Sequence, residues 1–131
     1  MKNLVLIFAN LVVLTIAQVP SYRLTGGFHS SNGILEVFYN DVWGTVCDDG
    51  FNSNAANVAC TSLGIAPTGT MANKSGITPS NQSQIWLDDL SCTGTEARID
   101  LCQHRTFGQH NCNHNEDVAL QCGEGKFDDF F

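Results

Sequence analysis

Six cysteines constrain the fold of this chain more than any other feature of its sequence. An even number of cysteines in a short, exported chain predicts disulfides, and six cysteines allow fifteen pairings among which spacing alone does not choose. No C-x-x-C pair occurs, so a zinc site built from paired cysteines is not expected. We therefore expect a small domain with three disulfides. The cysteines are Cys47, Cys60, Cys92, Cys102, Cys112 and Cys122.

The N-terminal segment predicts export. Lys2 supplies a positive charge, and the 13 residues from Leu4 to Ile16 are almost wholly apolar. Thr15 and Ala17 are small residues at the −3 and −1 positions of a cleavage before Gln18. Because 13 residues cannot span a bilayer, we predict a signal peptide over residues 1–17 and a secreted product without membrane insertion; a short membrane anchor is the alternative.

The charge balance excludes some partners. The chain has 6 basic and 13 acidic residues and a net charge of −7, which becomes −8 when Lys2 leaves with the signal peptide. A strongly acidic chain without a basic stripe does not suit nucleic acids or anionic membrane surfaces. Cations remain suitable partners.

Strands are expected in the first half of the mature chain. Tyr22–Leu24 is a short strand, and Asn40-Asp41 forms a turn before a further strand at Val42–Val46. Apolar residues alternate along the strand before that turn, with Leu35, Val37 and Tyr39 on one side and Ile34, Glu36 and Phe38 on the other. The two longer strands therefore form a hairpin.

A helix follows. One of the residues 52–54 caps it, its apolar face is Ala55, Val58, Ala59 and Leu63, and Gly64 ends it.

Residues 68–83 are polar and rich in turn residues, which predicts a long surface loop. The loop holds two N-glycosylation sequons, at Asn73 and Asn81.

The last third of the chain predicts three short elements and a tail. Ile85–Leu90 has strand character, and Thr95 caps a short helix over Glu96–Cys102. Val118, Leu120 and Cys122 alternate as a closing strand. Residues 123–131 form a flexible tail, for which a partner-binding peptide is the alternative.

Five blocks of the sequence resemble those of the scavenger receptor cysteine-rich (SRCR) domain family. They are YRLTGG, GILEVFYNDVWGTVCDDGF, NVACTSLG, IWLDDLSCTGTEARIDLC and HNCNHNEDVALQC. They run from Tyr22 to Cys122, nearly the whole mature chain. In the eight-cysteine class of the family, an extra pair of cysteines would occupy the positions of Ser31 and Ile65. The chain therefore resembles the six-cysteine class.

The resemblance implies a pairing and a fold. It pairs Cys47 with Cys112, Cys60 with Cys122 and Cys92 with Cys102. It places the domain at residues 18–122, as a compact α+β fold with a curved antiparallel sheet around one main helix.

The implied bridge between Cys47 and Cys112 would bring two acidic segments together. Bridged Cα atoms lie about 6 Å apart, so Asp48 and Asp49 would lie near Asn111 and Glu116. Calcium prefers several hard oxygen ligands on adaptable loops, and magnesium is the stricter alternative. By resemblance, Asp48, Asp49 and Glu116 form one metal site, and Asp88 or Asp89 with Asn111 forms a second. The alternative is that these aspartates only cap turns.

Three further features of the sequence are its histidines, its tryptophans and the motifs of catalysis. His110 and His114 have a spacing that a zinc site can use, but this interpretation is the weaker one. Trp43 and Trp86 lie in strand patterns, which favours packing in the core over stacking on a ligand. No G-x-S-x-G or H-E-x-x-H motif occurs, and similar domains are binding modules, so we expect no enzyme.

The resemblance implies a secreted module of innate recognition. It would bind polyanions, microbial surface ligands or an extracellular protein partner, in a manner that depends on calcium. Related scavenging domains often carry arginines where this chain has Ile34, Asn40 and Asp41. Because these basic residues are missing here, a bound cation would link the domain to anionic ligands. The alternatives are a protein-interaction module and a matrix or mucus component.

Overall fold

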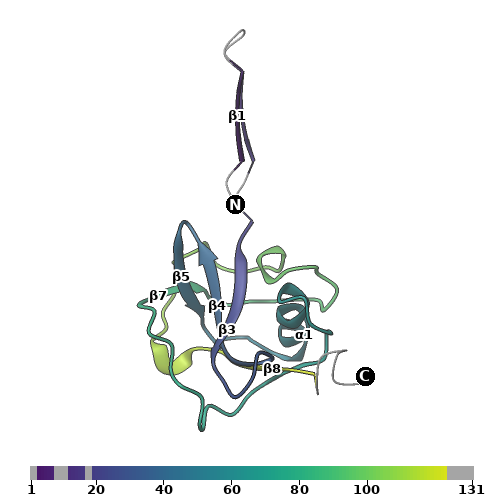
Figure 1. The fold of residues 1–131 in the computed structure, drawn as a ribbon, viewed down its shortest axis with the longest axis vertical. Coiled ribbons are helices and arrows are strands. Elements are labelled where there is room, and N and C mark those ends of the chain that lie inside the picture. The colour runs from purple at the N-terminus through teal and green to yellow at the C-terminus, as the bar shows by residue number, and fades with distance from the viewer. Residues whose placement is uncertain (1–2, 8–11, 17–18, 124–131) are drawn as a thin grey trace.

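A computed structural model describes residues 3–7, 12–16 and 19–123. The predicted cleavage site at Ala17–Gln18 and residues 124–131 of the predicted tail lie outside these ranges. Strands β1 (Asn3–Ile7) and β2 (Val12–Ile16) pair with each other in antiparallel fashion and project from the rest of the molecule (Figure 1). Within the described ranges, no helix has the length and apolar character needed to cross a membrane.

The remaining strands form one six-stranded sheet in the order β6-β8-β4-β5-β7, with β3 paired to β4 outside this path. All pairs are antiparallel except that of β5 with β7. The curled sheet and the one α-helix found among the described residues confirm the predicted α+β class (Figure 1). The strands are β3 (Ser21–Gly26), β4 (Asn32–Tyr39), β5 (Val42–Val46), β6 (Gly69–Met71), β7 (Gln84–Leu87) and β8 (Ala119–Cys122).

The predicted hairpin joins β4 to β5. Asn40 and Asp41 have φ angles of 51° and 64°, as a two-residue type I′ turn requires. Short polar side chains tolerate this left-handed backbone, which explains how the hairpin forms without glycine.

The predicted helix is α1 (Ser53–Ser62). The Asn52 side chain caps it by accepting a hydrogen bond from the N–H of Ala55 at 3.1 Å. Gly64, with φ 74°, follows the last turn in the left-handed conformation that ends many helices. Cap, apolar face and stop signal all agree with the sequence prediction.

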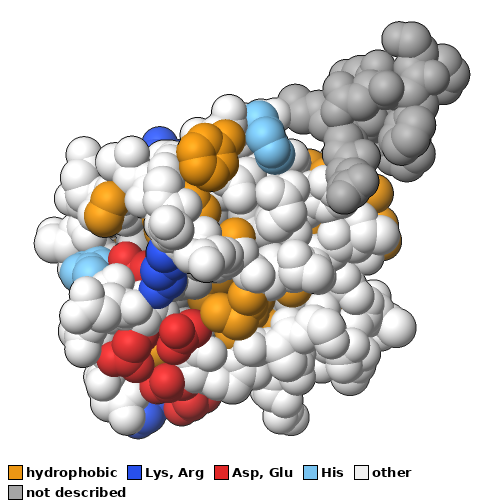
Figure 2. All heavy atoms as spheres, turned by 90° about the horizontal axis from the view of Figure 1, so that it is seen from below, with side chains coloured by type: hydrophobic (Ala, Val, Ile, Leu, Met, Phe, Trp, Pro, Cys, Tyr) orange, Lys and Arg blue, Asp and Glu red, His pale blue; other side chains and the backbone are white. Residues whose placement is uncertain are grey.

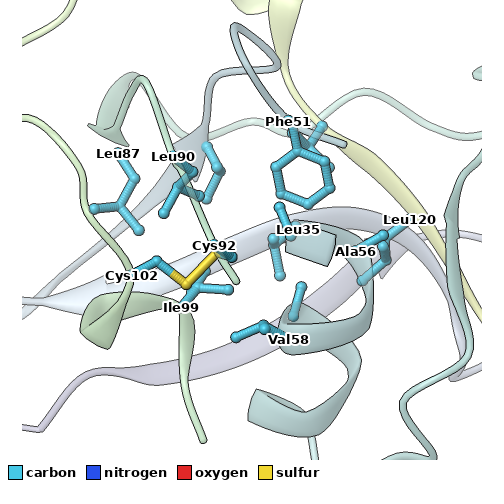
Figure 3. Close-up of a cluster of buried hydrophobic side chains, with 14 of the residues drawn as sticks. Leu35, Phe51, Ala56, Val58, Leu87, Leu90, Cys92, Ile99, Cys102 and Leu120 are labelled. Atoms are coloured by element: carbon cyan, nitrogen blue, oxygen red, sulfur yellow. A yellow bond between two sulfur atoms is a disulfide. The ribbon is translucent and has the colours of Figure 1, made fainter. Parts of the chain in front are cut away.

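The core lies between the concave sheet and α1. Leu35 of β4 lies beside Val58 of α1 (Figure 3), and Val37 of β4 belongs to the same buried cluster. Ile34 faces the other side of the sheet, in a small cluster with Ile77 and Ala119. The alternation predicted for β4 is therefore correct, although both of its faces are buried.

The segment 68–83 is largely exposed, as predicted, but it also contains a strand and a buried side chain. It contains β6, which pairs with β8, and it crosses the outer side of the sheet. Ile77 is only 7% exposed, and the Ser80 hydroxyl donates to the buried carboxylate of Glu36. A strand of three residues is too short to show periodicity in the sequence. β6 forms because it pairs with β8.

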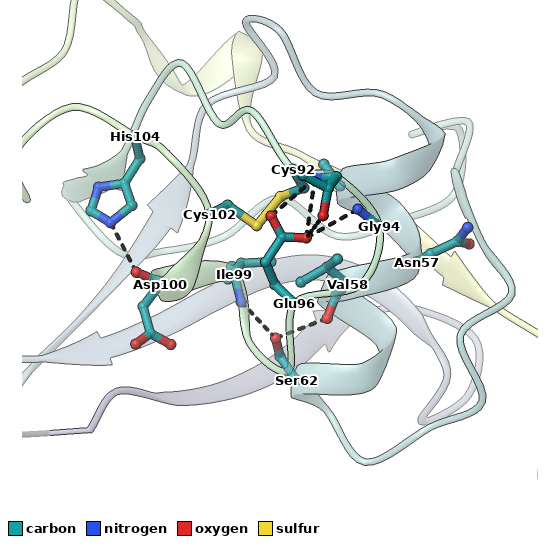
Figure 4. The surroundings of a disulfide bond; sticks show 12 residues. Asn57, Val58, Ser62, Cys92, Gly94, Glu96, Ile99, Asp100, Cys102 and His104 are labelled. Carbon is teal, nitrogen blue, oxygen red and sulfur yellow. Dashed lines mark hydrogen bonds between the residues drawn. A yellow bond between two sulfur atoms is a disulfide. The ribbon is translucent and has the colours of Figure 1, made fainter.

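The predicted helix Glu96–Cys102 is wrong. Only a 3-10 turn, Ile99–Leu101, forms there, and Thr95 does not cap it. The Glu96 carboxylate instead accepts the N–H groups of Thr93 and Gly94, which closes a tight turn beside the Cys92–Cys102 bridge (Figure 4). These bonds hold the carboxylate in its charged form and lower the pKa of Glu96 to about 2.

The predicted closing strand forms as β8, with Leu120 and Cys122 in the core and Ala119 in the small cluster with Ile77 on the other face.

One of the two tryptophan predictions needs correction. Trp86 is 9% exposed and belongs to the core, as predicted. Trp43 lies outside the core cluster, with the guanidinium of Arg23 3.8 Å from its ring centre.

Candidate metal centre

Three disulfides connect the segments around the acidic residues. They join Cys47 to Cys112, Cys60 to Cys122 and Cys92 to Cys102, which are the pairs that the resemblance implied. The Cα atoms of Cys47 and Cys112 are 6.3 Å apart across a sequence separation of 65 residues. Residues on both sides of this bridge therefore share one corner of the domain.

The first acidic group contains Asp48, Asp49 and Glu116. One carboxylate oxygen of each residue lies within 4.8 Å of those of the other two. The backbone sets this geometry, because the N–H of Asp48 donates to the carbonyl of Glu116 at 2.8 Å. Glu116 ends a 3-10 turn (His114–Glu116), where its Oε1 accepts the N–H of Asn113 at 3.1 Å. The structure thus brings together the three residues predicted for the first site.

The second group shares Asp49 with the first. A carboxylate oxygen of Asp49 lies within 4.8 Å of one of Asp88, which is fully buried. The side-chain amide of Asn111 lies between them and, with its nitrogen turned inward, donates to Asp88 at 3.3 Å and to Asp49 at 3.2 Å. We define the acidic corner as Asp48, Asp49, Asp88, Asn111 and Glu116. Figure 2 shows that Asp and Glu side chains gather in a patch on one face of the domain, with Lys or Arg side chains at its border.

Asp89 stands at the border of the acidic corner. It adopts a left-handed backbone with φ 54°, and its carboxylate lies 3.8 Å from the guanidinium of Arg105. The N–H of Asp89 donates to the carboxylate of Asp88 at 2.8 Å, which orients Asp88. Of the two aspartates predicted for the second site, the structure therefore groups Asp88 with Asp49 and leaves Asp89 outside.

Electrostatic repulsion acts on the acidic corner. The pKa of Asp49 is raised, first by partial desolvation and then by the charges of Glu116 and Asp88. Close carboxylates cost free energy when all are ionised, and a cation between them removes that cost. In the opposite orientation, with its oxygen turned inward, the side-chain amide of Asn111 would add a neutral oxygen to the same donor set.

The donor set fits a hard divalent cation. Carboxylate oxygens dominate it, an amide contributes one more, and the loops that carry them are irregular, which suits calcium better than magnesium. The metal groups identified among the described residues contain no histidine. His110 accepts the N–H of Cys112 through its Nδ1, so it supports the loop and does not pair with His114 for zinc.

His114 and Asp117 form a supporting pair under the acidic corner. The Nδ1 of His114 is 2.9 Å from the carboxylate of Asp117, and its Nε2 contacts the carbonyl of Ser83 at 3.0 Å. The hydrogen bond to Asp117 is the main reason that the pKa of His114 is raised. This pair ties the Glu116 turn to the segment before β7.

Each of the three arginines is paired with a carboxylate. Arg23 binds the buried Glu36 at 2.8 Å, and Arg98 binds Asp100 at 2.9 Å. Arg105 lies beside Asp89, as described above.

Sequence reasoning did not place two basic residues at the border of the acidic corner. Arg105 faces Asp89, and Lys74 donates to the carbonyl of Asn115 at 2.6 Å. Lys74 and Asn115 are 41 residues apart, and no local pattern predicts such a contact.

Comparisons with known proteins agree with the fold. The family model of the scavenger receptor cysteine-rich domain matches residues 25–123. The chain is 41% identical over 100 residues to the macrophage receptor MARCO of Mesocricetus auratus, covering 76% of this chain and 19% of that protein. It is 46% identical over 117 residues to a scavenger receptor cysteine-rich domain superfamily protein of Patiria pectinifera, covering 85% of this chain and 10% of that protein.

Solved structures of such domains are also similar. The dimeric form of the SRCR domain of mouse MARCO has a TM-score of 0.63 at 39% identity and covers 77% of this chain and 93% of that one. The third SRCR domain of murine neurotrypsin has a TM-score of 0.71 at 32% identity and covers 82% and 100%. The chain spans a fifth or less of the two longer relatives, so the likeness concerns this domain. With its fold, its three bridges and these matches, the chain belongs to the scavenger receptor cysteine-rich domain family.

Proposed function

We propose that this domain is a secreted recognition module that binds a divalent cation, preferentially calcium, at the acidic corner. Asp48, Asp49 and Glu116 would be the principal ligands, and Asp88 with Asn111 would add a second set. The observation that carries the proposal is the convergence of carboxylates from three chain segments that are far apart in sequence. Their mutual repulsion gives calcium a reason to bind.

The ligand we propose is anionic, such as a polyanion or a microbial surface polymer. Arg23, Arg98 and Arg105 each pair with a carboxylate, which leaves little basic surface to hold a polyanion directly. A cation at an exposed acidic site can keep a coordination position for an oxygen of the ligand. The likeness to a macrophage receptor supports a role in recognition.

A second candidate is binding of an extracellular protein partner, or a matrix role without scavenging. The aromatic cluster of Tyr39, Trp86 and Phe107 favours this candidate, because the partly buried rings of Tyr39 and Phe107 stack at 3.9 Å near the exposed Val42. Such a surface would bind without any cation. Sensitivity to a chelator therefore separates the two candidates.

The experiment is a retention assay with the purified domain on bacterial cells and on beads that carry a sulfated polysaccharide. The proposal predicts retention in 2 mM calcium that a chelator abolishes. The matched variants are Asp49→Asn, which changes the acidic corner, and Asp41→Asn, which removes one charge from the β4–β5 turn. We expect Asp49→Asn to lose retention and Asp41→Asn to keep it.

Retention that persists in chelator would favour the protein-partner candidate. Absence of retention on both surfaces would favour the matrix role. Equal loss in the two variants would mean that total charge, and not the acidic corner, controls binding.

A further inference from the structure

Phe28 is an unusually exposed aromatic residue. At 73%, its exposed fraction is the largest among the large hydrophobic residues that the structure describes. The edge of its ring lies directly over Gly76, where an added Cβ would come within 2.7 Å of the ring. Gly76 also has a φ of 79°, so a larger residue would be strained there. The ring is thus seated on the 73–77 segment with most of its surface in water.

The segment under Phe28 carries the first sequon. Asn73 precedes a closed turn in which the N–H of Ile77 donates to the carbonyl of Lys74 at 3.0 Å. The buried Ile77 anchors this turn, and the N–H of Thr78 donates to Gly26 at 2.9 Å. Asn73 and Gly76 are three positions apart in the sequence, so their Cα atoms are at most about 11 Å apart.

The side chain of Asn73 suits modification. It is exposed, and its Oδ1 accepts the N–H of Ser75 at 2.8 Å, in an Asx turn. Its amide nitrogen, the atom that a glycan would occupy, makes no hydrogen bond with the described residues. A sugar on this nitrogen breaks no contact of the fold.

We propose that Asn73 carries an N-linked glycan whose first sugars pack on the exposed face of Phe28. A pyranose ring presents a face of C–H groups, which fits the electron-rich face of an aromatic ring. The glycan would cover an apolar surface that otherwise faces water. This inference rests on the proposed export but not on cation binding.

The test begins with the full chain expressed in secreting eukaryotic cells. Peptide mapping of the protein from the medium should find a glycan on Asn73. Two matched variants are available: Ser75→Ala removes this sequon, and Ser83→Ala, the control, removes the sequon of Asn81. Both serines contribute only backbone groups to the contacts described here, so the fold is kept.

Thermal unfolding then separates packing from simple attachment. We expect Ser75→Ala to lower the Tm by about 3–6 °C, the shift for one aromatic contact in a domain of this length. Ser83→Ala should change the Tm by less than about 1 °C on the same scale. In a Phe28→Ala background, Ser75→Ala should cause no further decrease.

A second readout does not depend on stability. An amidase that releases N-glycans should act more slowly on Asn73 of the native protein than on Asn73 of Phe28→Ala, because packing hides the linkage. An unmodified Asn73 in the secreted protein would overturn the inference, as would equal release rates in both proteins or a Tm effect of Ser75→Ala that survives in Phe28→Ala. None of these results bears on calcium binding.

Discussion

Replacing Cys47 and Cys112 with alanine is expected to lower the free energy of unfolding by about 3 kcal/mol without calcium. The sequence separation of 65 residues would suggest a larger loss of about 4 kcal/mol. However, the Cys60–Cys122 bridge already joins the same regions. With that bridge intact, the shortest chain path from Cys47 to Cys112 runs over 13 residues to Cys60 and over 10 residues from Cys122. The loop that the Cys47–Cys112 bridge closes is therefore shorter than its sequence separation suggests.

A matched control exists in the same chain. The Cys92–Cys102 bridge closes a loop of 10 residues, for which the same relation also gives about 3 kcal/mol. The two double variants lose the same atoms and should be similarly destabilised. Only loss of Cys47–Cys112 frees Asp49 from Asn111, so only that variant should lose calcium affinity, by about tenfold through lost preorganisation.

Urea unfolding followed by the fluorescence of the two tryptophans measures the first quantity, and calcium titration below the unfolding transition measures the second. A loss of less than about 1 kcal/mol for Cys47→Ala/Cys112→Ala would refute the loop argument. Equal loss of calcium affinity in both double variants would refute the claim that this bridge assembles the acidic corner.

Three further predictions concern single residues. Leu87→Ala should cost about 3 kcal/mol in urea unfolding, because this side chain is fully buried in the core; a cost below about 1 kcal/mol would contradict the packing described. Because the pKa of Asp49 is raised, its carboxyl group binds a proton more tightly in the folded chain than in the unfolded chain. In metal-free buffer, the free energy of unfolding should therefore fall as the pH rises from about 4 through the folded-state pKa. Asp49→Asn should remove this fall and raise the Tm at pH 7, and an unchanged pH profile would contradict it. Glu96, with its pKa lowered to about 2, contributes stability that is present above its ordinary value and is lost as pH falls toward 2. Glu96→Gln should therefore flatten the Tm profile between pH 2 and 5, whereas a profile parallel to that of the wild type would exclude the turn as its cause.

Local signals explain why part of the fold was predictable. The hairpin around Asn40 and the helix after Asn52 each have their turn or cap residues within a few positions of the element they define. By contrast, β6 forms only because β8 lies beside it, and the segment around Glu96 forms a turn because a side chain returns to the backbone. Such elements depend on tertiary contacts that a window of sequence does not contain.

The candidate site was likewise predictable from the sequence only in part. Asp48 and Asp49 are visible as a pair, but their proximity to Glu116 depends on a bridge whose partners spacing alone left open. The resemblance supplied that pairing. Asp89 lies outside the acidic corner and beside Arg105 because its backbone is left-handed, and no local sequence signal marks this conformation.

Isothermal calorimetry of calcium binding to the metal-free mature domain tests the central claim most directly. In physiological salt we expect saturable binding with a Kd of about 10⁻⁴–10⁻³ M, the range of extracellular calcium modules. Glu116→Gln should weaken it strongly, while Glu96→Gln, outside the acidic corner, should leave it unchanged. Absence of binding heat, together with a Tm that 5 mM calcium does not move, would contradict the account.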